Sequence, residues 1–210
     1  MEKKKDLLPI SVYLGGSFGL GIIIGIIWVI LQLPENTIDL SQIIISGILF
    51  IVLFILYYKR IKTDFLRLSK KDILWSIVIL IIILGLNILI SSLFETFNIN
   101  VSNQNSLNDI FLQYKIPSCL YIILFAPLAE ELVFRYSIET ISKNNTIFLI
   151  VSSLIFGIMH GVEIATILYI ILGFGFGYLY LKTNKNITAS ILVHMINNTI
   201  SILTMFLMLK

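Results

Sequence analysis

The stretch APLAEELVFR, residues 126–135, places two adjacent glutamates and an arginine inside a long apolar run. A charge near the middle of a bilayer costs about 2.5–3.5 kcal/mol on insertion scales, so such groups usually face a cavity or a partner. On a helix with about 100° per residue, Glu131 and Arg135 share a face, whereas Glu130 is turned about a third of a circle from Arg135. We therefore expect Glu131 and Arg135 to form a structural pair and Glu130 to carry chemistry.

The composition of the whole chain explains why this stretch is expected in a membrane. Of its 210 residues, 58% are hydrophobic and 13% are charged, against roughly 25% charged in a soluble domain. The chain is predicted to be an all-α, polytopic bundle of membrane helices around a cavity, with the lipid bilayer as its partner. The net charge of +3 does not indicate nucleic-acid binding, because the cations lie in short loops and not along one face. The single Cys119 excludes an internal disulfide framework.

Seven apolar segments are candidate membrane spans, since about 20 apolar residues cross a bilayer. They lie at about 9–32, 41–58, 73–94, 117–141, 146–160, 164–182 and 187–209. Between them we expect a basic loop from Lys59 to Asp72 and a polar loop from Asn98 to Asn108. No internal repeat is visible, so 1–210 is predicted to be one membrane domain.

Small residues in two of the spans predict close approach between helices. They are Gly15, Gly19, Gly21 and Gly25 in the first span and Gly173, Gly175 and Gly177 in the sixth.

The positions of the 15 Lys and Arg residues predict the topology. If the seven spans alternate, one side receives Lys3, Lys4, Lys5, Lys59, Arg60, Lys62, Arg67, Lys70, Lys71, Lys143, Lys182 and Lys185. Only Lys115 and Lys210 fall on the other side. Under the positive-inside rule, the chain is a multi-pass protein of the cell membrane with a cytoplasmic N-terminus and basic loop.

The chain has only two histidines, and each lies in an apolar span. Phe156 precedes His160 by one helical turn, and Asn198 follows His194 by one turn. Asn197 is an equally plausible neighbour of His194, so spacing does not decide between the two asparagines. An Asn and a His stacked in this way either satisfy each other or aim donors at a common point.

A depth argument connects Glu130 with His160. If the fourth and fifth spans form a hairpin that turns near Asn144, the two residues lie at similar depth. His194 is then expected closer to the cytoplasm than His160. We therefore expect irregular backbone over 161–164, which is tolerated in a membrane where it lines a cavity. Glu163, in the same segment, is expected to be a loop residue and not a site member.

Three patterns follow one another across these apolar spans: Glu130-Glu131-x-x-x-Arg135, Phe156-x-x-x-His160 and His194-x-x-x-Asn198. In this order they resemble the CPBP (CAAX protease and bacteriocin-processing, or Abi) family of intramembrane endopeptidases. The resemblance covers about the last hundred residues, so 116–210 is the expected catalytic core, and the three spans within 1–115 carry no family motif.

The resemblance implies a fold of seven or eight helices around a cavity open towards the cytoplasm. It implies a peptide or protein substrate at the membrane, either prenylated or bacteriocin-like. By the same resemblance, Glu130 and His160 activate a water, and His194 and Asn198 stabilise the oxyanion. Glu131 and Arg135 match the remaining motif positions.

The chemistry of these residue types agrees with that assignment. A carboxylate removed from water is a stronger base, which suits proton abstraction from a water. Hydrogen-bond donors that meet a forming oxyanion are worth about 2.7–4 kcal/mol each. Asn198 and a protonated or suitably tautomeric His194 can supply such donors.

Three other interpretations compete with this one. Zinc could bind Glu130, His160 and His194, with Glu131 as the general base, and family members are often called metalloproteases. The sequence lacks a His-Glu-x-x-His helix, however, and we favour a mechanism that requires no cofactor. Non-catalytic immunity or regulatory proteins could retain the same fold. An ion or proton transporter could use the buried carboxylates and histidines, although no inverted repeat supports one.

Overall fold

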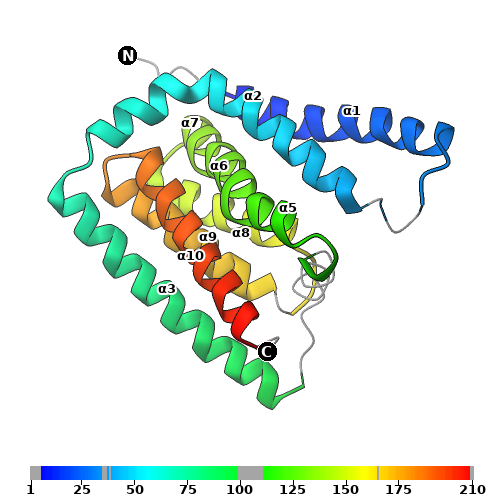
Figure 1. Cartoon of the computed structure of the whole chain (residues 1–210). Coiled ribbons are helices and arrows are strands. Elements are labelled where there is room, and N and C mark those ends of the chain that lie inside the picture. The colour runs from blue at the N-terminus through cyan, green and yellow to red at the C-terminus, as the bar shows by residue number, and fades with distance from the viewer. Residues whose placement is uncertain (1–5, 35–36, 38, 99–110, 165, 209–210) are drawn as a thin grey trace.

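The structure is a computed structural model, and it describes residues 6–34, 37, 39–98, 111–164 and 166–208. Within these ranges the chain is helical and contains no strand, so the predicted all-α bundle is confirmed (Figure 1). The helices are α1 (Leu8–Ile30), α2 (Asp39–Leu66), α3 (Lys70–Thr96), α5 (Lys115–Leu120), η2 (Tyr121–Phe125), α6 (Ala126–Glu131), η3 (Leu132–Ser137), α7 (Ile138–Ile141), α8 (Asn145–Met159), α9 (Thr166–Lys182) and α10 (Ile187–Met208). From α5 to α7 the chain forms one continuous helix, in which η2 and η3 are π-helical turns.

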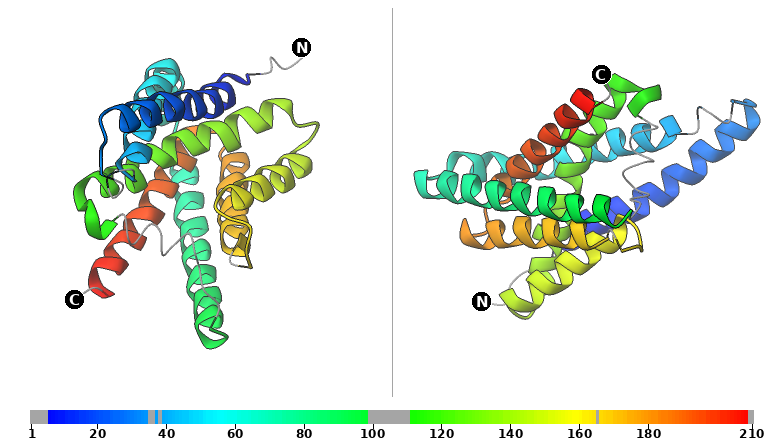
Figure 2. Two further views of the ribbon diagram at one scale, coloured as in Figure 1. Left: turned by 90° about the vertical axis from the view of Figure 1, so that its right-hand side faces the viewer. Right: turned by 90° about the horizontal axis from the view of Figure 1, so that it is seen from below.

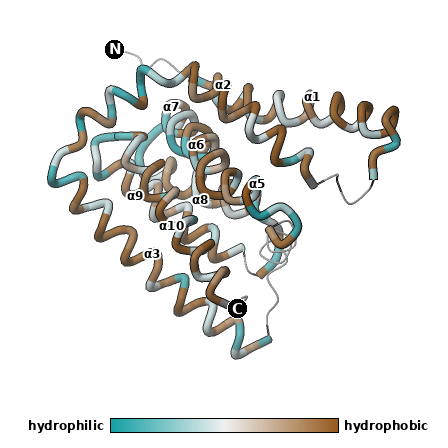
Figure 3. Tube along the Cα trace, viewed as in Figure 1, coloured by the Kyte–Doolittle hydropathy of each residue, from teal (hydrophilic) through white to brown (hydrophobic). Residues whose placement is uncertain are grey.

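Seven apolar helical segments occupy the predicted positions, but they differ in length. Five are long and apolar enough to cross a membrane, namely α1, α2, α3, the helix from α5 to α7, and α10. The other two, α8 and α9, have only 15 and 17 residues. Figure 3 shows that the apolar residues dominate the long helices and that polar residues gather towards helix ends.

The predicted basic loop from Lys59 to Asp72 is wrong. Helix α2 continues to Leu66, and α3 begins at Lys70. Lys and Arg are good helix formers whose long side chains extend towards water, so a helix can continue through them beyond the apolar layer. Ser69 and Asp72 then start α3 with a capping box. The predicted polar loop from Asn98 to Asn108 lies almost wholly outside the described residues, as do Lys3 to Lys5 and Lys210.

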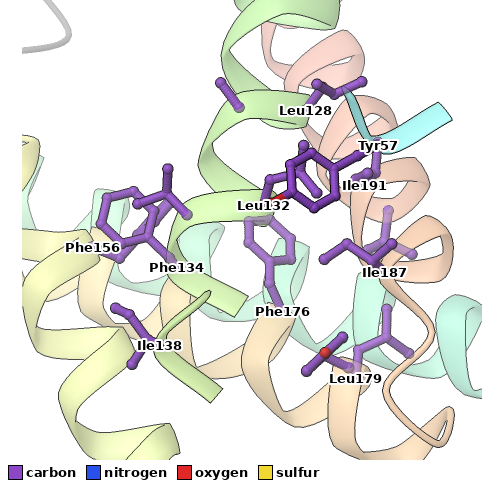
Figure 4. Close-up of a cluster of buried hydrophobic side chains, with 14 of the residues drawn as sticks. Tyr57, Leu128, Leu132, Phe134, Ile138, Phe156, Phe176, Leu179, Ile187 and Ile191 are labelled. Carbon is purple, nitrogen blue, oxygen red and sulfur yellow. The ribbon is translucent and has the colours of Figure 1, made fainter. Parts of the chain in front are cut away.

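The central layer of the bundle consists of α10 and the helix that contains α6, which pack against each other (Figure 1). The α8–α9 hairpin and α3 pack around them, and α1 lies outermost against α2 and η3 (Figure 2). Phe156 on α8 contacts Phe134 on η3 and Phe176 on α9, with ring centroids 5.4 and 6.3 Å apart, and all three belong to the buried cluster (Figure 4).

The predicted close approach is confirmed for the sixth span. A Cβ atom on Gly173 would lie 3.1 Å from the Cα atom of Ser153 on α8, and one on Gly175 would lie 2.6 Å from Ile83 on α3. The same prediction is wrong for Gly15, Gly19, Gly21 and Gly25, since a Cβ there would meet no atom of the described chain within 4 Å. The peripheral position of α1 explains this, because only part of its surface meets another helix.

The turns that carry the cations gather at one end of the bundle, which we call the basic end. Its described cations are Lys59, Arg60, Lys62, Arg67, Lys70, Lys71, Lys143, Lys182 and Lys185. Hydrogen bonds hold the turns together: Asn186 donates to the Asp64 carbonyl at 2.7 Å, and Lys185 Nζ lies 2.5 Å from Glu139. The opposite end, where α1 ends and α5 begins, is called the distal end. The side of the membrane that each end faces remains a prediction.

Candidate active site

A cavity of about 530 Å³ lies inside the bundle, and residues from α1, α2, α3, η2, α6, α8, α9 and α10 line it. Glu130, His160, His194 and Asn198 all belong to this lining. The structure therefore brings together the four residues predicted from three separate spans. Their catalytic roles remain predictions. Glu163 lies in the turn after α8 and is not part of the lining.

Glu131 and Arg135 form the expected pair behind the cavity. Arg135 Nε lies 3.1 Å from Glu131 Oε2, and both side chains have 0% exposure. Arg135 also donates from Nη1 to Ser152 Oγ at 2.6 Å, and its guanidinium lies 4.9 Å from the centre of the Phe156 ring. A charged pair in a dry interior needs such additional partners to offset its loss of hydration.

The Glu131 carboxylate also binds α10, which the sequence analysis did not predict. Ser190 donates to its Oε2 atom, and His194 Nδ1 lies 3.0 Å from its Oε1 atom. One buried carboxylate thus joins Arg135 on η3 to two residues of α10. A sequence signal was available, because Ser190 precedes His194 by one turn. Ser152 similarly precedes Phe156 by one turn.

The contact with Glu131 shows which ring nitrogen of His194 carries a hydrogen. A nitrogen beside a carboxylate oxygen must carry hydrogen, so we assign Nδ1 as the donor. The ring stacks on Phe176 with centroids 4.5 Å apart, and Nε2 lies 3.8 Å from Glu130 Oε2. With Nδ1 engaged in this way, the neutral ring presents a lone pair at Nε2, and His194 can donate from Nε2 only as an imidazolium.

His160 follows the last residue of α8 and closes its C-terminus. Its Nδ1 atom lies 2.8 Å from the Phe156 carbonyl oxygen, and its ring stacks on Tyr169 at 4.5 Å. With Nδ1 donating to that carbonyl, Nε2 carries the lone pair of the neutral ring and can act as a base. The chain then leaves the helix through Gly161, whose φ of 132° favours glycine. The irregular backbone predicted over 161–164 is confirmed.

Asn198 is positioned by a backbone group that Pro127 leaves without a partner. In the π-helical turn η2, the Ala126 N–H donates to the Tyr121 carbonyl. The Ile122 carbonyl would then face residue 127, but proline has no N–H. Asn198 Nδ2 fills this gap at 2.8 Å. Its second N–H has no acceptor among the residues that the structure describes.

The choice between Asn197 and Asn198 is not resolved by position alone, because both line the cavity. Asn197 Nδ2 donates to Asn198 Oδ1 at 3.3 Å and so supports its neighbour. The Asn197 Oδ1 atom is buried and meets no donor in the described ranges.

The alternative zinc ligands do not fit a metal ion as they lie. No group of three His, Cys, Asp or Glu side chains in the described part of the chain is arranged to hold one. His194 Nδ1 is engaged by Glu131 and His160 Nδ1 by a carbonyl, which leaves the two Nε2 atoms and Glu130 as the possible donors. We therefore derive no step through zinc.

Comparison with known proteins adds an independent finding. The family model described as "Type II CAAX prenyl endopeptidase Rce1-like" matches residues 112–200, which include all seven motif positions. The "Putative membrane peptidase YdiL" of Bacillus subtilis is 30% identical over 166 residues, covering 74% of this chain and 68% of that protein. The chain belongs to the CPBP family. No solved structure matches it.

Two further relatives of this CPBP chain come from Lactococcus lactis. The UPF0177 protein YajF is 30% identical over 155 residues, covering 70% of this chain and 76% of that protein. The UPF0177 protein YxdF is 29% identical over 153 residues, covering 70% and 86%. At the level of the CPBP family, the chain is therefore a multi-pass membrane protein of a peptidase family. The names of the matching family and of these relatives do not mention a metal, so they do not support the metalloprotease interpretation.

Proposed function

We propose that this protein is an intramembrane endopeptidase, which hydrolyses a peptide bond of a lipid-anchored or hydrophobic peptide with a water activated by Glu130. The observation that carries the proposal is the lining of the cavity. One carboxylate, two imidazoles and a carboxamide from three helices meet there inside an apolar bundle. Polar groups removed from water cost free energy unless they are paired, so packing alone gives no reason to gather them.

The proposed reaction begins with a water between Glu130 and Nε2 of His160. Its oxygen attacks the carbonyl carbon of the scissile bond while its proton moves to Glu130. The carbonyl oxygen takes up the negative charge and meets the second Nδ2–H of Asn198 and the Nε2–H of the His194 imidazolium. The carbonyl then re-forms as the C–N bond breaks, and the proton on Glu130 moves to the leaving amine.

Glu131 and Arg135 act in this proposal as positioning residues. The Nδ1 contact of Glu131 orients the His194 ring, and the Arg135 charge balances that of Glu131. Such support from behind holds the reacting groups within the small tolerance that catalysis requires. The proposed mechanism needs no metal.

Cleavage by the purified full chain in proteoliposomes tests the proposal. Two fluorogenic probes cover the proposed substrate classes: a peptide with a prenylated cysteine followed by three residues, and an unmodified apolar peptide. We expect cleavage of at least one probe, and we expect Glu130→Gln to lower its rate by at least about 100-fold. The proposal is wrong if Glu130→Ala cleaves the same probe as fast as the wild type.

The same variants separate the competing functions. A cellular phenotype that survives Glu130→Gln, without cleavage by any form, would favour a non-catalytic binding or immunity protein. Proton flux into liposomes that depends on Glu130 would favour a transporter.

A further inference from the structure

The cavity extends from the middle of the bundle towards the distal end. Most of its lining residues come from the distal parts of their helices, while Tyr13, Phe134 and His194 lie nearer the basic end. Gln42 is the fourth residue of α2, which starts at the distal end, and Leu168 is the third residue of α9. Ser91 lies near the end of α3, Met205 near the end of α10, and Met159 is the last residue of α8. The cavity therefore reaches the distal end.

The lengths of α8 and α9 explain why there is space at that end. With a rise of 1.5 Å per residue, their 15 and 17 residues extend over about 22 and 25 Å. The hydrocarbon core of a bilayer is about 30 Å thick. Both helices meet the basic end, so the turn between them stops short of the distal membrane surface. The distal half of the bundle is thus left partly unfilled beside this turn.

The turn itself is suited to this depth. Val162 is 88% exposed and Ile164 is 64% exposed, and both are apolar. The backbone around them is irregular, but Thr166 Oγ1 donates to the Gly161 carbonyl at 2.6 Å and accepts from the Glu163 N–H at 3.0 Å. Irregular backbone within a membrane is tolerated where it is satisfied and borders a cavity. His160, at the start of the turn, belongs to the cavity lining.

The charges predict which side of the membrane the distal end faces. Nine Lys and Arg residues lie at the basic end, whereas the described part of the distal end has Lys115 alone. The positive-inside rule places the basic end in the cytoplasm. A cavity open towards the cytoplasm, as the family resemblance implies, is incompatible with that orientation, because the cavity reaches the other end.

We infer that the cavity admits its substrate from the extracytoplasmic side of the membrane. That the cavity binds a substrate rests on the proposed function. The side of the membrane from which the substrate enters rests on the charge distribution. It selects a peptide segment that is exported or presented at the outer leaflet over the prenylated tail of a cytoplasmic protein. The residues that such a segment first meets are polar ones near the distal ends of helices, including Gln42 and Ser91.

Thiol labelling in intact cells tests the orientation. In a Cys119→Ser background, Ser91→Cys and Ser201→Cys place a thiol in the cavity lining, and Lys143→Cys places one at the basic end. A charged, membrane-impermeant methanethiosulfonate is added outside, and unreacted thiols are then counted by a maleimide gel shift. We expect the cavity cysteines to react at least ten-fold faster than Lys143→Cys, which should react only after permeabilisation.

Three labelling results would overturn the inference. They are the reverse pattern, equal labelling of both ends in intact cells, and cavity cysteines that stay unreactive after permeabilisation.

A cleavage experiment separates this inference from the proposed function. The unmodified apolar probe is added to right-side-out and to inverted vesicles that contain the full chain. Cleavage confined to right-side-out vesicles supports the inference, and cleavage confined to inverted vesicles overturns it while leaving the peptidase intact. If neither orientation cleaves any probe but the labelling is as expected, the proposed function fails and the orientation stands.

Discussion

Two neighbouring glutamates should differ in how the same substitution changes the stability of the protein. Glu131→Gln keeps the shape of the side chain but leaves the Arg135 guanidinium buried without a counter-ion, and both side chains have 0% exposure. Breaking a buried pair from one side costs about 3–5 kcal/mol. The hydrogen bonds from Ser190 and His194 also lose their charged acceptor, which is worth about 1 kcal/mol each. We expect a loss of at least about 3 kcal/mol in the free energy of unfolding.

Glu130→Gln is the matched control. The Glu130 side chain is 12% exposed to the cavity, and its nearest ionic neighbour is His194 Nε2 at 3.8 Å. That distance is longer than a hydrogen bond, and Glu130 borders the cavity, so we expect the loss of this contact to cost less than the loss of the Glu131 pair. We therefore expect Glu130→Gln to keep its stability and to lose its activity, whereas Glu131→Gln loses stability and, through His194, activity as well.

Unfolding in mixed micelles of a mild detergent and dodecyl sulfate measures both effects. Trp75 reports on packing, because its ring contacts Tyr178 between α3 and α9. The double variant with Glu131→Gln and Arg135→Gln should be at least about 2 kcal/mol more stable than the sum of the single losses predicts, since it removes both charges together. If Glu131→Gln unfolds at the same detergent fraction as Glu130→Gln, the buried charge cluster does not hold the bundle together and the reasoning is refuted.

Three further outcomes follow from the structure. Asn198→Ala should cost about 1–3 kcal/mol of stability by leaving the Ile122 carbonyl unpaired. The cost should fall in a Pro127→Ala background, because alanine restores a backbone N–H. An equal cost in both backgrounds in the micelle assay would contradict this. Gly157→Ala should destabilise the α8–α9 hairpin by about 1–3 kcal/mol in the same assay, because the added Cβ would lie 3.1 Å from a backbone nitrogen of α9. Gly21→Ala is the control and should leave the stability unchanged, because its Cβ would lie in open space. Chelators should leave the cleavage rate unchanged, and inhibition that zinc reverses would restore the metalloprotease interpretation.

The pairing of Glu131 with Arg135 could be predicted because it is local. Two residues four apart on a helix meet whatever surrounds them. The bonds from Glu131 to Ser190 and His194 join segments about 60 positions apart. They depend on how α10 is rotated towards α6, and the sequence does not contain that angle. Residue spacing could have suggested only that Ser190 and His194 share a face.

The errors in the sequence analysis have a common origin in hydropathy. Apolar content marks where a chain meets lipid, but a helix ends where its backbone finds caps, as Ser69 shows between α2 and α3. The glycines of α1 were misjudged for a related reason. Small residues permit close packing, but they do not show whether another helix is present. The effect of Pro127 was partly predictable, since proline must break the hydrogen-bond ladder. That Asn198 supplies the missing donor depends on how α10 packs against η2, which the sequence does not show.

The buried cluster also explains how charge can be used inside lipid. Glu131 and Arg135 balance each other, and Glu130 faces His194, so the site is neutral when His194 is protonated. In the proposed reaction, the water proton neutralises Glu130 while the new negative charge appears on the substrate oxygen. The negative charge thus moves from Glu130 to the substrate oxygen, and both positions face the His194 imidazolium. No net charge enters or leaves the low-dielectric interior. Because Coulomb energies are large there, a step that conserves the local charge has a lower barrier than one that does not. This requires Glu131 to remain ionised throughout, which is why Glu131→Gln is expected to impair catalysis even under conditions in which the variant remains folded.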